Sequence, residues 1–438
     1  MKPIYVGLLG TGTVGGGAYT VLKRNQPEIS RRTGRNIEIR MIADLDQEKV
    51  RRLTEGDHVT ITNDAFEVAR HPEIDIVIEL IGGQTIAREV MLTAIEHGKH
   101  VITANKALLA AHGNEIFAAA HQHGVIVAFE AAVAGGIPII KALREGLTAN
   151  RIEWIAGIIN GTSNFILSEM RSSGLDFNTA LASAQRLGYA EADPAYDIEG
   201  IDAAHKITIM AALAFGVPVQ FDKVYIEGIT QLANEDIRHA EELGYRIKLL
   251  GMTKRVAKGI ELRVHPALIP ERRLIANVEG VMNAVIINGD AVGSTLYYGA
   301  GAGAEPTASA VIADLVDITR LLTASPEQRV PALAFLPELL SDTPIVAMED
   351  VETAYYLRLQ VTDKTGVLAD VTRVLADHGI SINAMVQKEH HEGKDKVNII
   401  MLTHKTTEKH INDVITKIQN LPAVTDEVIR IRIEELSS

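Results

Sequence analysis

Two lysines and a group of carboxylates have the types and spacing for acid–base chemistry. Asp202 and Lys206 are four residues apart, so a helix that begins near Gly200 would place both on one face. The residues around Lys206 are almost wholly apolar, and burial favours the neutral amine, which can accept a proton. From spacing alone, a solvent-exposed helix start with an ion pair is an equally good interpretation. An acidic segment precedes this helix and contains Glu191, Asp193, Pro194 and Asp197.

A second lysine, Lys106, follows a short apolar run in Thr103-Ala104-Asn105-Lys106. If that run is a parallel strand, its carboxyl end belongs to the edge of the sheet where ligands bind. Position alone supports a functional lysine and an ordinary surface lysine at a helix start about equally.

A glycine-rich turn near the N-terminus has the spacing of a dinucleotide-binding motif. An apolar run over residues 4–9 leads into Gly10-Thr11-Gly12-Thr13-Val14-Gly15, and apolar residues at helical spacing follow. In this motif the first glycine permits the turn, the second lets the backbone approach a pyrophosphate, and the third lets the helix pack on the strand. The N–H groups at the helix N-terminus would bind the phosphates. The context favours a dinucleotide site over a turn without a ligand.

An acidic residue after the second strand should bind the adenosine ribose, and Asp44 is the candidate. It comes late in the sequence because residues 24–35 are expected to form a polar insertion after the first helix. A carboxylate here disfavours a 2′-phosphate, and no arginine directly follows it, which makes NAD plausible. Arg40 or Arg51 could instead accept the phosphate of NADP, so the choice of cofactor stays open.

The elements that must position these residues alternate between strand and helix. Such alternation predicts a parallel sheet covered on both faces, a Rossmann-like doubly wound domain over residues 1–130. Over residues 131–325, the sequence pattern predicts an α+β domain that holds the substrate. The expected strands are 37–43, 74–81, 100–103, 125–129, 151–159, 261–266 and 283–288, and the expected helices are 88–96, 108–121, 179–187 and 201–214.

The C-terminal residues 351–438 predict a separate small domain after a proline-containing, partly helical linker at 326–350. Strands at 355–361, 380–387, 396–403 and 428–433 and helices at 367–378 and 409–419 give the order βαββαβ, a ferredoxin-like unit. His390 and His391 fall in its charged turn, where exposure to solvent is a better interpretation than metal binding.

Composition excludes several classes of protein. The 438 residues are enough for more than one domain, and the absence of cysteine rules out disulfides, thiolate metal sites and a cysteine nucleophile. With Lys+Arg 43 and Asp+Glu 56, the net charge of −13 argues against broad nucleic-acid binding. The sequence has neither a signal-peptide pattern nor an apolar run that could span a bilayer, so we expect a cytoplasmic protein without a membrane partner.

Taken together, these segments resemble the homoserine dehydrogenase family. The segments that carry the resemblance are Gly10–Gly15, Thr103–Lys106, Gly188–Lys206, Asn160-Gly161-Thr162-Ser163-Asn164 and Gly299-Ala300-Gly301-Ala302-Gly303-Ala304-Glu305-Pro306-Thr307. The C-terminal domain resembles an ACT domain, a module that binds a regulatory amino acid. No aspartate kinase portion precedes the glycine turn, so the resemblance is to the monofunctional enzyme.

The resemblance implies an activity. Members of this family interconvert L-homoserine and L-aspartate 4-semialdehyde with NAD or NADP, on the path to threonine, methionine and isoleucine. Feedback regulation by an amino acid such as threonine would act through the ACT domain. The family forms homodimers through the second domain, and the ACT domains could pair further copies into a homotetramer.

The resemblance also implies roles for individual residues. Lys206 would donate and accept the proton, Lys106 would lie near the reacting oxygen, and Asp202 would orient the substrate or a lysine. Glu191 would bind the substrate ammonium, and Gly161 and Thr162 would offer backbone contacts. The residues that would bind the dinucleotide are Gly10, Thr11, Gly12, Thr13, Val14, Gly15, Asp44, Lys106, Gly301 and Gly303.

Two further sites are candidates, and the resemblance implies the first of them. A monovalent cation, often sodium, would be bound by the side chain of Glu130 and by the carbonyl groups of Val133, Gly135 and Ile137, although this segment could equally be a turn without an ion. An effector would bind near Asp363, Gly366 and Asn383. A turn and a strand edge that serve only oligomerisation explain those three residues nearly as well.

Two other functions are compatible with the same features. One is a different amino-acid-linked NAD(P) dehydrogenase, and the presence of Glu191, Asp202 and Lys206 together argues against it. The other is a non-catalytic sensor of NAD and amino acids, which would not need both Lys106 and Lys206.

Overall fold

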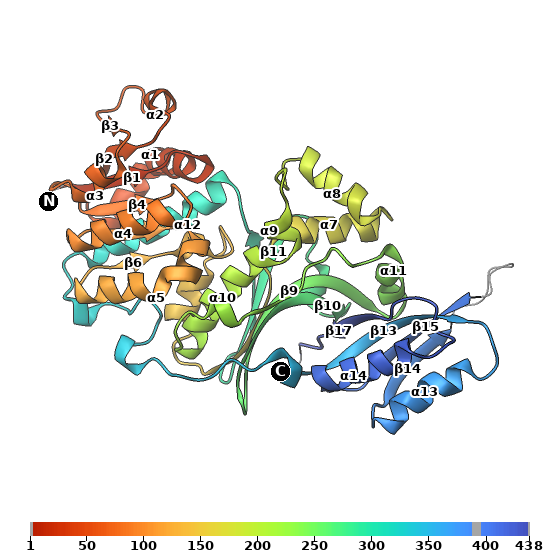
Figure 1. Cartoon of the computed structure of the whole chain (residues 1–438). Helices are drawn as coiled ribbons and strands as arrows, with labels where there is room; N and C mark the ends of the chain where they lie inside the picture. Colours follow the sequence, from red (N-terminus) through yellow and green to blue (C-terminus); the bar gives the residue numbers. More distant parts are fainter. Residues whose placement is uncertain (1–2, 388–395, 437–438) are drawn as a thin grey trace. The chain divides into compact units, whose positions relative to one another are not determined.

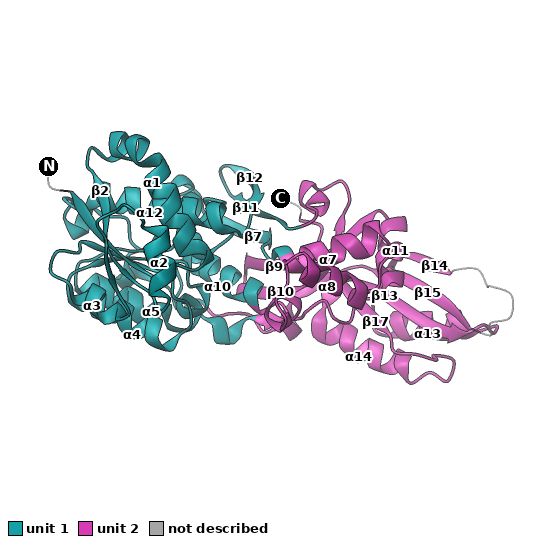
Figure 2. Ribbon diagram, turned by 90° about the horizontal axis from the view of Figure 1, so that it is seen from above, with its two compact units in different colours: residues 1–161, 202–224, 281–343 teal, residues 162–201, 225–280, 344–438 magenta. Residues whose placement is uncertain are grey.

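A computed structural model of the chain describes residues 3–387 and 396–436. The described part divides into two compact units, each assembled from separate stretches of sequence (Figure 2). Unit 1 comprises residues 1–161, 202–224 and 281–343, and unit 2 comprises residues 162–201, 225–280 and 344–438. His390 and His391 lie outside the described residues. The domain boundaries expected from the sequence stay predictions.

Unit 1 is built on a parallel sheet with the strand order β3-β2-β1-β4-β5-β6. Its strands are β1 (Ile4–Leu9), β2 (Ile37–Ala43), β3 (Thr60–Thr62), β4 (Ile76–Glu79), β5 (His100–Thr103) and β6 (Val127–Ala128). The strand order reverses between β1 and β4, and the carboxyl ends of such strands form the crevice in which doubly wound folds bind ligands. The predicted Rossmann-like sheet is confirmed.

Helices connect these strands, and the first of them is longer than the sequence suggested. They are α1 (Thr13–Thr33), α2 (Gln47–Leu53), α3 (Ala65–Arg70), α4 (Thr85–Glu96) and α5 (Lys106–Gln122). The polar insertion predicted at 24–35 is wrong, because α1 continues through Pro27 to Thr33 and is capped by Gly34, which has φ +69°. The extension buries Ile29 and turns polar side chains to solvent, which explains its composition.

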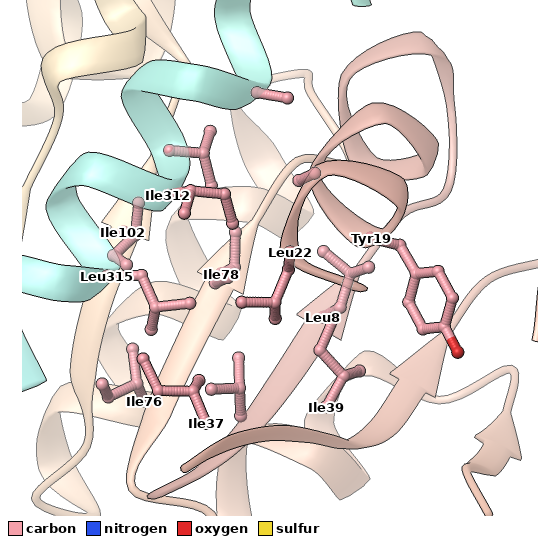
Figure 3. Close-up of a cluster of buried hydrophobic side chains, with 14 of the residues drawn as sticks. Leu8, Tyr19, Leu22, Ile37, Ile39, Ile76, Ile78, Ile102, Ile312 and Leu315 are labelled. Atoms are coloured by element: carbon pink, nitrogen blue, oxygen red, sulfur yellow. The ribbon is translucent and has the colours of Figure 1, made fainter. Parts of the chain in front are cut away.

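A helix from much later in the chain completes the core of this sheet. α12 (Ala304–Leu321) packs beside α1, and its apolar face joins the side chains of the strands in one buried cluster (Figure 3). Ile312 and Leu315 of α12 lie in this cluster with Leu22 of α1 and with Ile76 and Ile78 of β4. No helix was expected at 304–321 from the sequence.

The rest of unit 1 consists of a buried helix, an antiparallel sheet and short turns. α10 (Ile201–Phe215) begins at the boundary of the units and is buried almost throughout. The sheet has β11 (Met282–Gly289) between β7 (Ile152–Ile158) and β12 (Gly293–Ala300). The short helical turns are η1 (Glu130–Ala132), α6 (Ile139–Lys141), η2 (Ala142–Gly146), η3 (Phe221–Lys223), η5 (Pro326–Gln328) and η6 (Pro337–Leu339).

Unit 2 contains a mixed sheet with the order β9-β10-β17-β13-β15-β14. The strands are β9 (Tyr245–Val256), β10 (Gly259–Pro270), β13 (Glu352–Thr362), β14 (Ile382–Gln387), β15 (Lys396–Thr403) and β17 (Ile429–Ile433). Two short strands extend it: β8 (Tyr225–Ile226) pairs with β10, and β16 (Thr406–Thr407) pairs with β13. Further helices are α7 (Gly161–Ser172), α8 (Phe177–Arg186), α9 (Ala195–Ile198), η4 (Leu274–Asn277), α11 (Asn234–Glu242) and η7 (Met348–Asp350).

The C-terminal part of unit 2 has the predicted ferredoxin-like arrangement. α13 (Val367–Asp377) and α14 (Glu408–Gln419) cover one face of strands β17, β13, β15 and β14 (Figure 1). Apolar side chains from both helices and the strands, including Leu357, Val371 and Ile411, form its core. β17 also pairs in parallel with β10, so the ferredoxin-like module continues the sheet of β9 and β10. Within the described ranges, no helix has the length and apolarity needed to cross a membrane.

Candidate active site

Asp202 is the centre of a charged cluster in the first turn of α10. Its Oδ2 accepts hydrogen bonds from Lys206 Nζ at 2.6 Å and from Asn160 Nδ2 at 2.9 Å. Its Oδ1 lies 3.2 Å from Lys106 Nζ. The structure therefore brings together Lys106, Asp202 and Lys206, which the sequence placed on two separate segments. Asn160 is the fourth member of this cluster. It lies in the segment Asn160–Asn164, which carries part of the family resemblance, but no role was predicted for it.

Lys206 is buried, with 8% of its surface exposed. It follows Asp202 by one turn of α10, and its ammonium also donates to the carbonyl oxygen of Ile159, at 2.6 Å. Two acceptors thus hold Nζ in one position on a helix whose neighbouring residues, including Ile207 and Met210, are also buried. The interpretation as a solvent-exposed ion pair is therefore wrong.

Charge balance keeps Asp202 ionised. Burial by itself would raise the pKa of this carboxyl, which is only 7% exposed. The nearby ammonium groups of Lys206 and Lys106, together with the hydrogen bonds from Lys206 and Asn160, outweigh burial and hold the pKa of Asp202 far below its ordinary value. A carboxylate fixed between two ammonium groups can orient both of them for proton transfer.

Lys106 is held at the carboxyl end of β5 by a network of hydrogen bonds. It is the first residue of α5, and the preceding Asn105 caps that helix by accepting from the N–H of Leu108. The side-chain amide of Asn105 also donates to the carbonyl oxygen of Gly83, at 2.6 Å. The turn that carries Lys106 is therefore hydrogen-bonded to the turn after β4. That turn lies where the strand order of the sheet reverses, between β1 and β4.

Glu79, the last residue of β4, is a positioning residue that the sequence analysis missed. It is fully buried, accepts from the hydroxyl of Thr103 at 2.6 Å, and accepts from the N–H groups of Ile81 and Gly82. Burial raises the pKa of Glu79 against the effect of these hydrogen bonds. The side chain thus joins the ends of β4 and β5. A carboxylate that ends the apolar run Ile76-Val77-Ile78 was the signal that could have revealed it.

The glycine turn has the geometry that a dinucleotide requires. Gly10 has φ +86°, and a Cβ there would lie 2.7 Å from the carbonyl oxygen of Leu80. At Gly15 a Cβ would lie 2.0 Å from the carbonyl oxygen of Gly10, so only glycine lets α1 pack on the turn. Gly12 is exposed, and no described atom lies within 4 Å of a Cβ placed there. The first and third glycines are close-packed, and the second leaves the backbone open to a phosphate.

Asp44 follows β2 and is tied to the same turn. Its Oδ2 accepts from both the N–H and the hydroxyl of Thr11, each at 2.6 Å, and its Oδ1 accepts from the N–H of Asp46. Burial would raise its pKa, but these hydrogen bonds outweigh burial and hold the pKa of Asp44 below its ordinary value. The structure therefore places a negative charge next to the glycine turn.

The segment with Gly301 and Gly303 leads into α12, whose N-terminus lies next to α1. A Cβ at Gly17 of α1 would lie 2.7 Å from the carbonyl oxygen of Ala304. Arg24 and Glu305 pair across the two helices through two hydrogen bonds of 2.8 and 3.0 Å. The two glycine-rich segments therefore precede neighbouring helices, and both helix N-termini offer N–H groups to an anion.

The segment 130–137 is a tight, mostly buried turn. Glu130 is buried and accepts from the N–H groups of Ile140 and Lys141, and burial raises its pKa against these bonds. Ala134 and Gly135 both have positive φ, +56° and +53°. In the described ranges no group of three or more histidines, aspartates and glutamates could hold a metal ion. A carboxylate and backbone carbonyl groups are oxygen ligands, the kind that hard cations prefer.

The other substrate-site candidates lie in and around α7. The hydroxyl of Thr162 donates to the carbonyl oxygen of Tyr189, and that of Ser163 donates to the carbonyl oxygen of Asp197. These bonds, each within unit 2, fasten the acidic segment that contains the exposed Glu191 to the start of α7. Gly161 belongs to unit 1, where a Cβ would lie 2.7 Å from the carbonyl oxygen of Val281.

The effector candidates fall into two places in the ferredoxin-like module. Asp363 and Gly366 are exposed at the turn between β13 and α13, where Gly366 has φ +94°. Asn383 lies near the start of β14, level with Tyr356 near the beginning of β13. At about 3.3 Å per strand residue, this leaves Asn383 about 20 Å from the end of β13. One copy of the chain does not bring the three residues together.

The comparisons with known proteins agree over the whole chain. Family models match as "homoserine dehydrogenase, NAD binding domain" over residues 10–130, "homoserine dehydrogenase" over 138–316 and "ACT domain" over 355–423. Homoserine dehydrogenases from Pseudomonas aeruginosa and Neisseria gonorrhoeae are 60% and 57% identical over 437 and 436 residues, with all of each chain covered.

Solved structures give the same result. A homoserine dehydrogenase from Thiobacillus denitrificans is 65% identical, with a TM-score of 0.95 over 100% of this chain and 99% of that one. A hyperthermophilic archaeal homoserine dehydrogenase in complex with NADPH is 25% identical, with a TM-score of 0.62 over 74% of this chain and 99% of that one. The sequence, the parallel sheet with its glycine turn and these relatives lead to one conclusion: the chain belongs to the homoserine dehydrogenase family of NAD(P)-binding oxidoreductases and carries an ACT domain.

Proposed function

We propose that Lys206 exchanges the proton of the reacting oxygen in the reversible oxidation of L-homoserine to L-aspartate 4-semialdehyde. Oxidation of the alcohol removes one hydride and one proton, and a bound nicotinamide supplies the place for the hydride. The neutral amine of Lys206 accepts the proton in this direction, and its ammonium returns it during reduction. The observation that supports this role most directly is the buried Nζ of Lys206, 2.6 Å from Asp202.

The other members of the cluster support this proton transfer. Asp202 pairs with the ammonium groups of Lys206 and Lys106. Lys106 donates to the reacting oxygen as negative charge develops on that oxygen. Asn160 holds Asp202 in place through its side-chain amide. Glu191 binds the ammonium group of the substrate, while Gly161 and Thr162 contribute backbone contacts. The test of the activity is an absorbance assay with L-homoserine and each of NAD and NADP. Reduction of neither cofactor would contradict the proposal.

We propose that Asp44 makes the chain favour NAD over NADP. The ionised carboxylate would repel a 2′-phosphate, and the ribose hydroxyls of NAD could donate to it. Asp44→Asn keeps an acceptor for Thr11 and removes the charge, so kcat/KM for NADP should rise relative to that for NAD by about tenfold or more, equivalent to about 1.4 kcal/mol.

Steady-state kinetics with both cofactors measure this ratio. Asp46→Asn is the matched control, because Asp46 is an exposed neighbouring carboxylate that caps α2. An unchanged ratio in Asp44→Asn would show that the charge of Asp44 does not set the preference.

We propose that Glu130 and the carbonyl groups of Val133, Gly135 and Ile137 bind a monovalent cation such as sodium. The buried carboxylate and the two consecutive residues with positive φ support this site. Replacing sodium chloride by choline chloride at equal ionic strength should lower the melting temperature of the parent, because bound ions stabilise the folded state. Glu130→Gln should lose most of that sodium dependence. Identical melting curves of the parent in both salts would argue against a site.

We propose that an amino acid such as L-threonine binds between the ACT modules of two copies of the chain. The ACT module is the ferredoxin-like module of strands β13 to β17 with α13 and α14. Asp363 and Gly366 of one copy and Asn383 of the other would then complete one site, which a single copy cannot do. Asn383→Ala should raise the concentration of L-threonine for half-inhibition by about tenfold, the loss expected for one or two hydrogen bonds. Asn420→Ala, an exposed asparagine at the end of α14, is the control. Parent-like inhibition of Asn383→Ala would contradict this assignment.

We propose that the chain forms a homodimer or a homotetramer. The two-copy effector site requires at least a dimer, and β12 exposes the apolar side chains of Leu296 and Tyr298. Native mass spectrometry measures the assembly, and a monomer at micromolar concentration would contradict both the dimer and the shared effector site.

A further inference from the structure

A charged cluster around the buried Arg432 in unit 2 links the ACT module to the chain segment just after β8. Arg432 of β17 is fully buried, and its guanidinium donates to Glu408 at the start of α14 through Nε at 3.0 Å and Nη2 at 2.5 Å. Its Nη1 donates to Glu227, 2.8 Å away, which follows β8. One side chain of the last strand therefore holds both an ACT residue and a residue outside the ACT module.

Tyr225 completes the cluster. Its hydroxyl donates to Glu227 at 2.7 Å and accepts from Arg432 at 3.0 Å, and its ring lies under the guanidinium at 5.0 Å. Burial would raise the pKa of Glu227, but Arg432 and these hydrogen bonds outweigh burial and lower it. Each charge has partners with defined geometry, so the position of Glu227 depends on the position of Arg432.

The turn that begins at Glu227 packs directly on the end of the acidic segment. A Cβ at Gly228 would lie 2.3 Å from the carbonyl oxygen of Ile198 and 2.6 Å from the Cα of Glu199. The N–H of Ile229 donates to the same carbonyl oxygen, at 2.8 Å. The backbone of this turn and the backbone of residues 198–199 are therefore in contact with no side chain between them.

The acidic segment, residues 188–200, contains Glu191 and leads without a break into α10. Its last residue, Gly200, has φ +84°, and a Cβ there would lie 3.1 Å from Val264 of β10 and 3.4 Å from Ile226 of β8. Close packing on this side leaves little room for adjustment. A displacement of the turn at Glu227 would therefore displace the end of the segment.

We propose that Arg432 and Glu227 are positioning residues for substrate binding, so that the last strand of the ACT module supports residues 188–200. The inference rests on the proposed function through one assignment, that of Glu191 to the substrate ammonium. It follows that the ACT module contributes to the active enzyme and not only to its regulation. Removal of the module would leave Glu227 without its buried counter-charge and β10 without its partner strand β17.

The test uses two variants of the full-length chain that disturb the turn by different means. Glu227→Gln keeps the shape of the side chain and removes its charge, and Gly228→Ala adds a methyl group where the carbonyl oxygen of Ile198 lies. In each, KM for L-homoserine should rise about tenfold, whereas KM for the dinucleotide should stay within about twofold, as expected when substrate binding alone is lost.

Asp236→Asn is the matched control. Asp236 of α11 is also fully buried and accepts from the guanidinium of Arg358 in β13, at 2.6 and 3.0 Å, so it also ties the ACT strands to an earlier element. Its loss should lower the melting temperature as much as Glu227→Gln does. It should leave KM for L-homoserine unchanged, because its hydrogen bonds with Arg358 and Tyr356 do not involve residues 188–200.

Hydrogen–deuterium exchange without substrate tests the same idea independently of activity. Peptides that cover residues 188–200 should exchange faster in Glu227→Gln and Gly228→Ala than in the parent, and at the parent rate in Asp236→Asn. This measurement remains decisive even if the parent does not oxidise homoserine. If Glu227→Gln does not fold, Tyr225→Phe is the second variant. It removes only the hydrogen bonds of the Tyr225 hydroxyl with Glu227 and Arg432 and is therefore a milder change. A lower melting temperature with unchanged KM and unchanged exchange would overturn the proposal.

Discussion

Replacing Lys206 by alanine should lower kcat for homoserine oxidation by about three orders of magnitude, within the 10²–10⁴-fold range of general acid–base catalysis. The variant loses the amine that Asp202 and the carbonyl group of Ile159 hold in position, and water cannot occupy that position with the same basicity. The affinity for the dinucleotide should stay close to that of the parent, because the glycine turn and Asp44 are unchanged.

Steady-state kinetics and a fluorescence titration with the reduced dinucleotide measure the two quantities separately. Lys248→Met is the matched control, since Lys248 is a buried lysine that donates to the carbonyl group of Val278 and to Asn164. Burial lowers the pKa of Lys248 to about 8, yet the proposed reaction does not use it. That variant should lose stability with a far smaller effect on kcat. A Lys206→Ala enzyme as active as the parent, or one whose dinucleotide affinity falls in parallel, would rule out the assigned role.

Asp202→Asn should lower kcat by about two orders of magnitude, the lower end of the effect of a group that acts on the proton-transfer residue. The amide keeps the shape of the side chain but leaves the ammonium groups of Lys206 and Lys106 without their counter-charge. Because a neutral neighbour no longer favours the ammonium form, the rate of oxidation should reach its plateau at a lower pH than in the parent.

The same variant has a defined effect on stability. Since the pKa of Asp202 is lowered in the folded state, its ion pairs stabilise the fold at pH values above the ordinary aspartate pKa of about 3.9. That stabilisation is lost as the pH falls below this value and through the folded pKa. Denaturant unfolding should therefore show a constant loss of stability for Asp202→Asn between about pH 5 and pH 8, and a smaller loss below about pH 4. Asp193→Asn, an exposed carboxylate of the acidic segment, is the control. A loss that does not depend on pH would show that the ion pairs are not its cause.

The sequence determined the local features of this protein. Glycine spacing after an apolar run marked the dinucleotide turn, because a tight turn, an open backbone and a close helix contact each require glycine at a fixed position. The βαββαβ order at the C-terminus followed from hydrophobic periodicity, which depends only on neighbouring residues. The four-residue spacing of Asp202 and Lys206 was enough to place both on one face of a helix.

Only the tertiary structure decided which distant segments meet. Lys206 is held by the carbonyl group of Ile159, and Asp202 is held by Asn160. The core of the parallel sheet depends on α12, and the turn at Glu227 depends on Arg432. The separation of Asn383 from Gly366 also appeared only in the strand register. Local spacing carries no information on such contacts, because they form between residues far apart in the chain when elements bury their apolar faces against one another. For this protein, the sequence therefore named the groups that we propose to react, and the packing of distant elements set their burial and position.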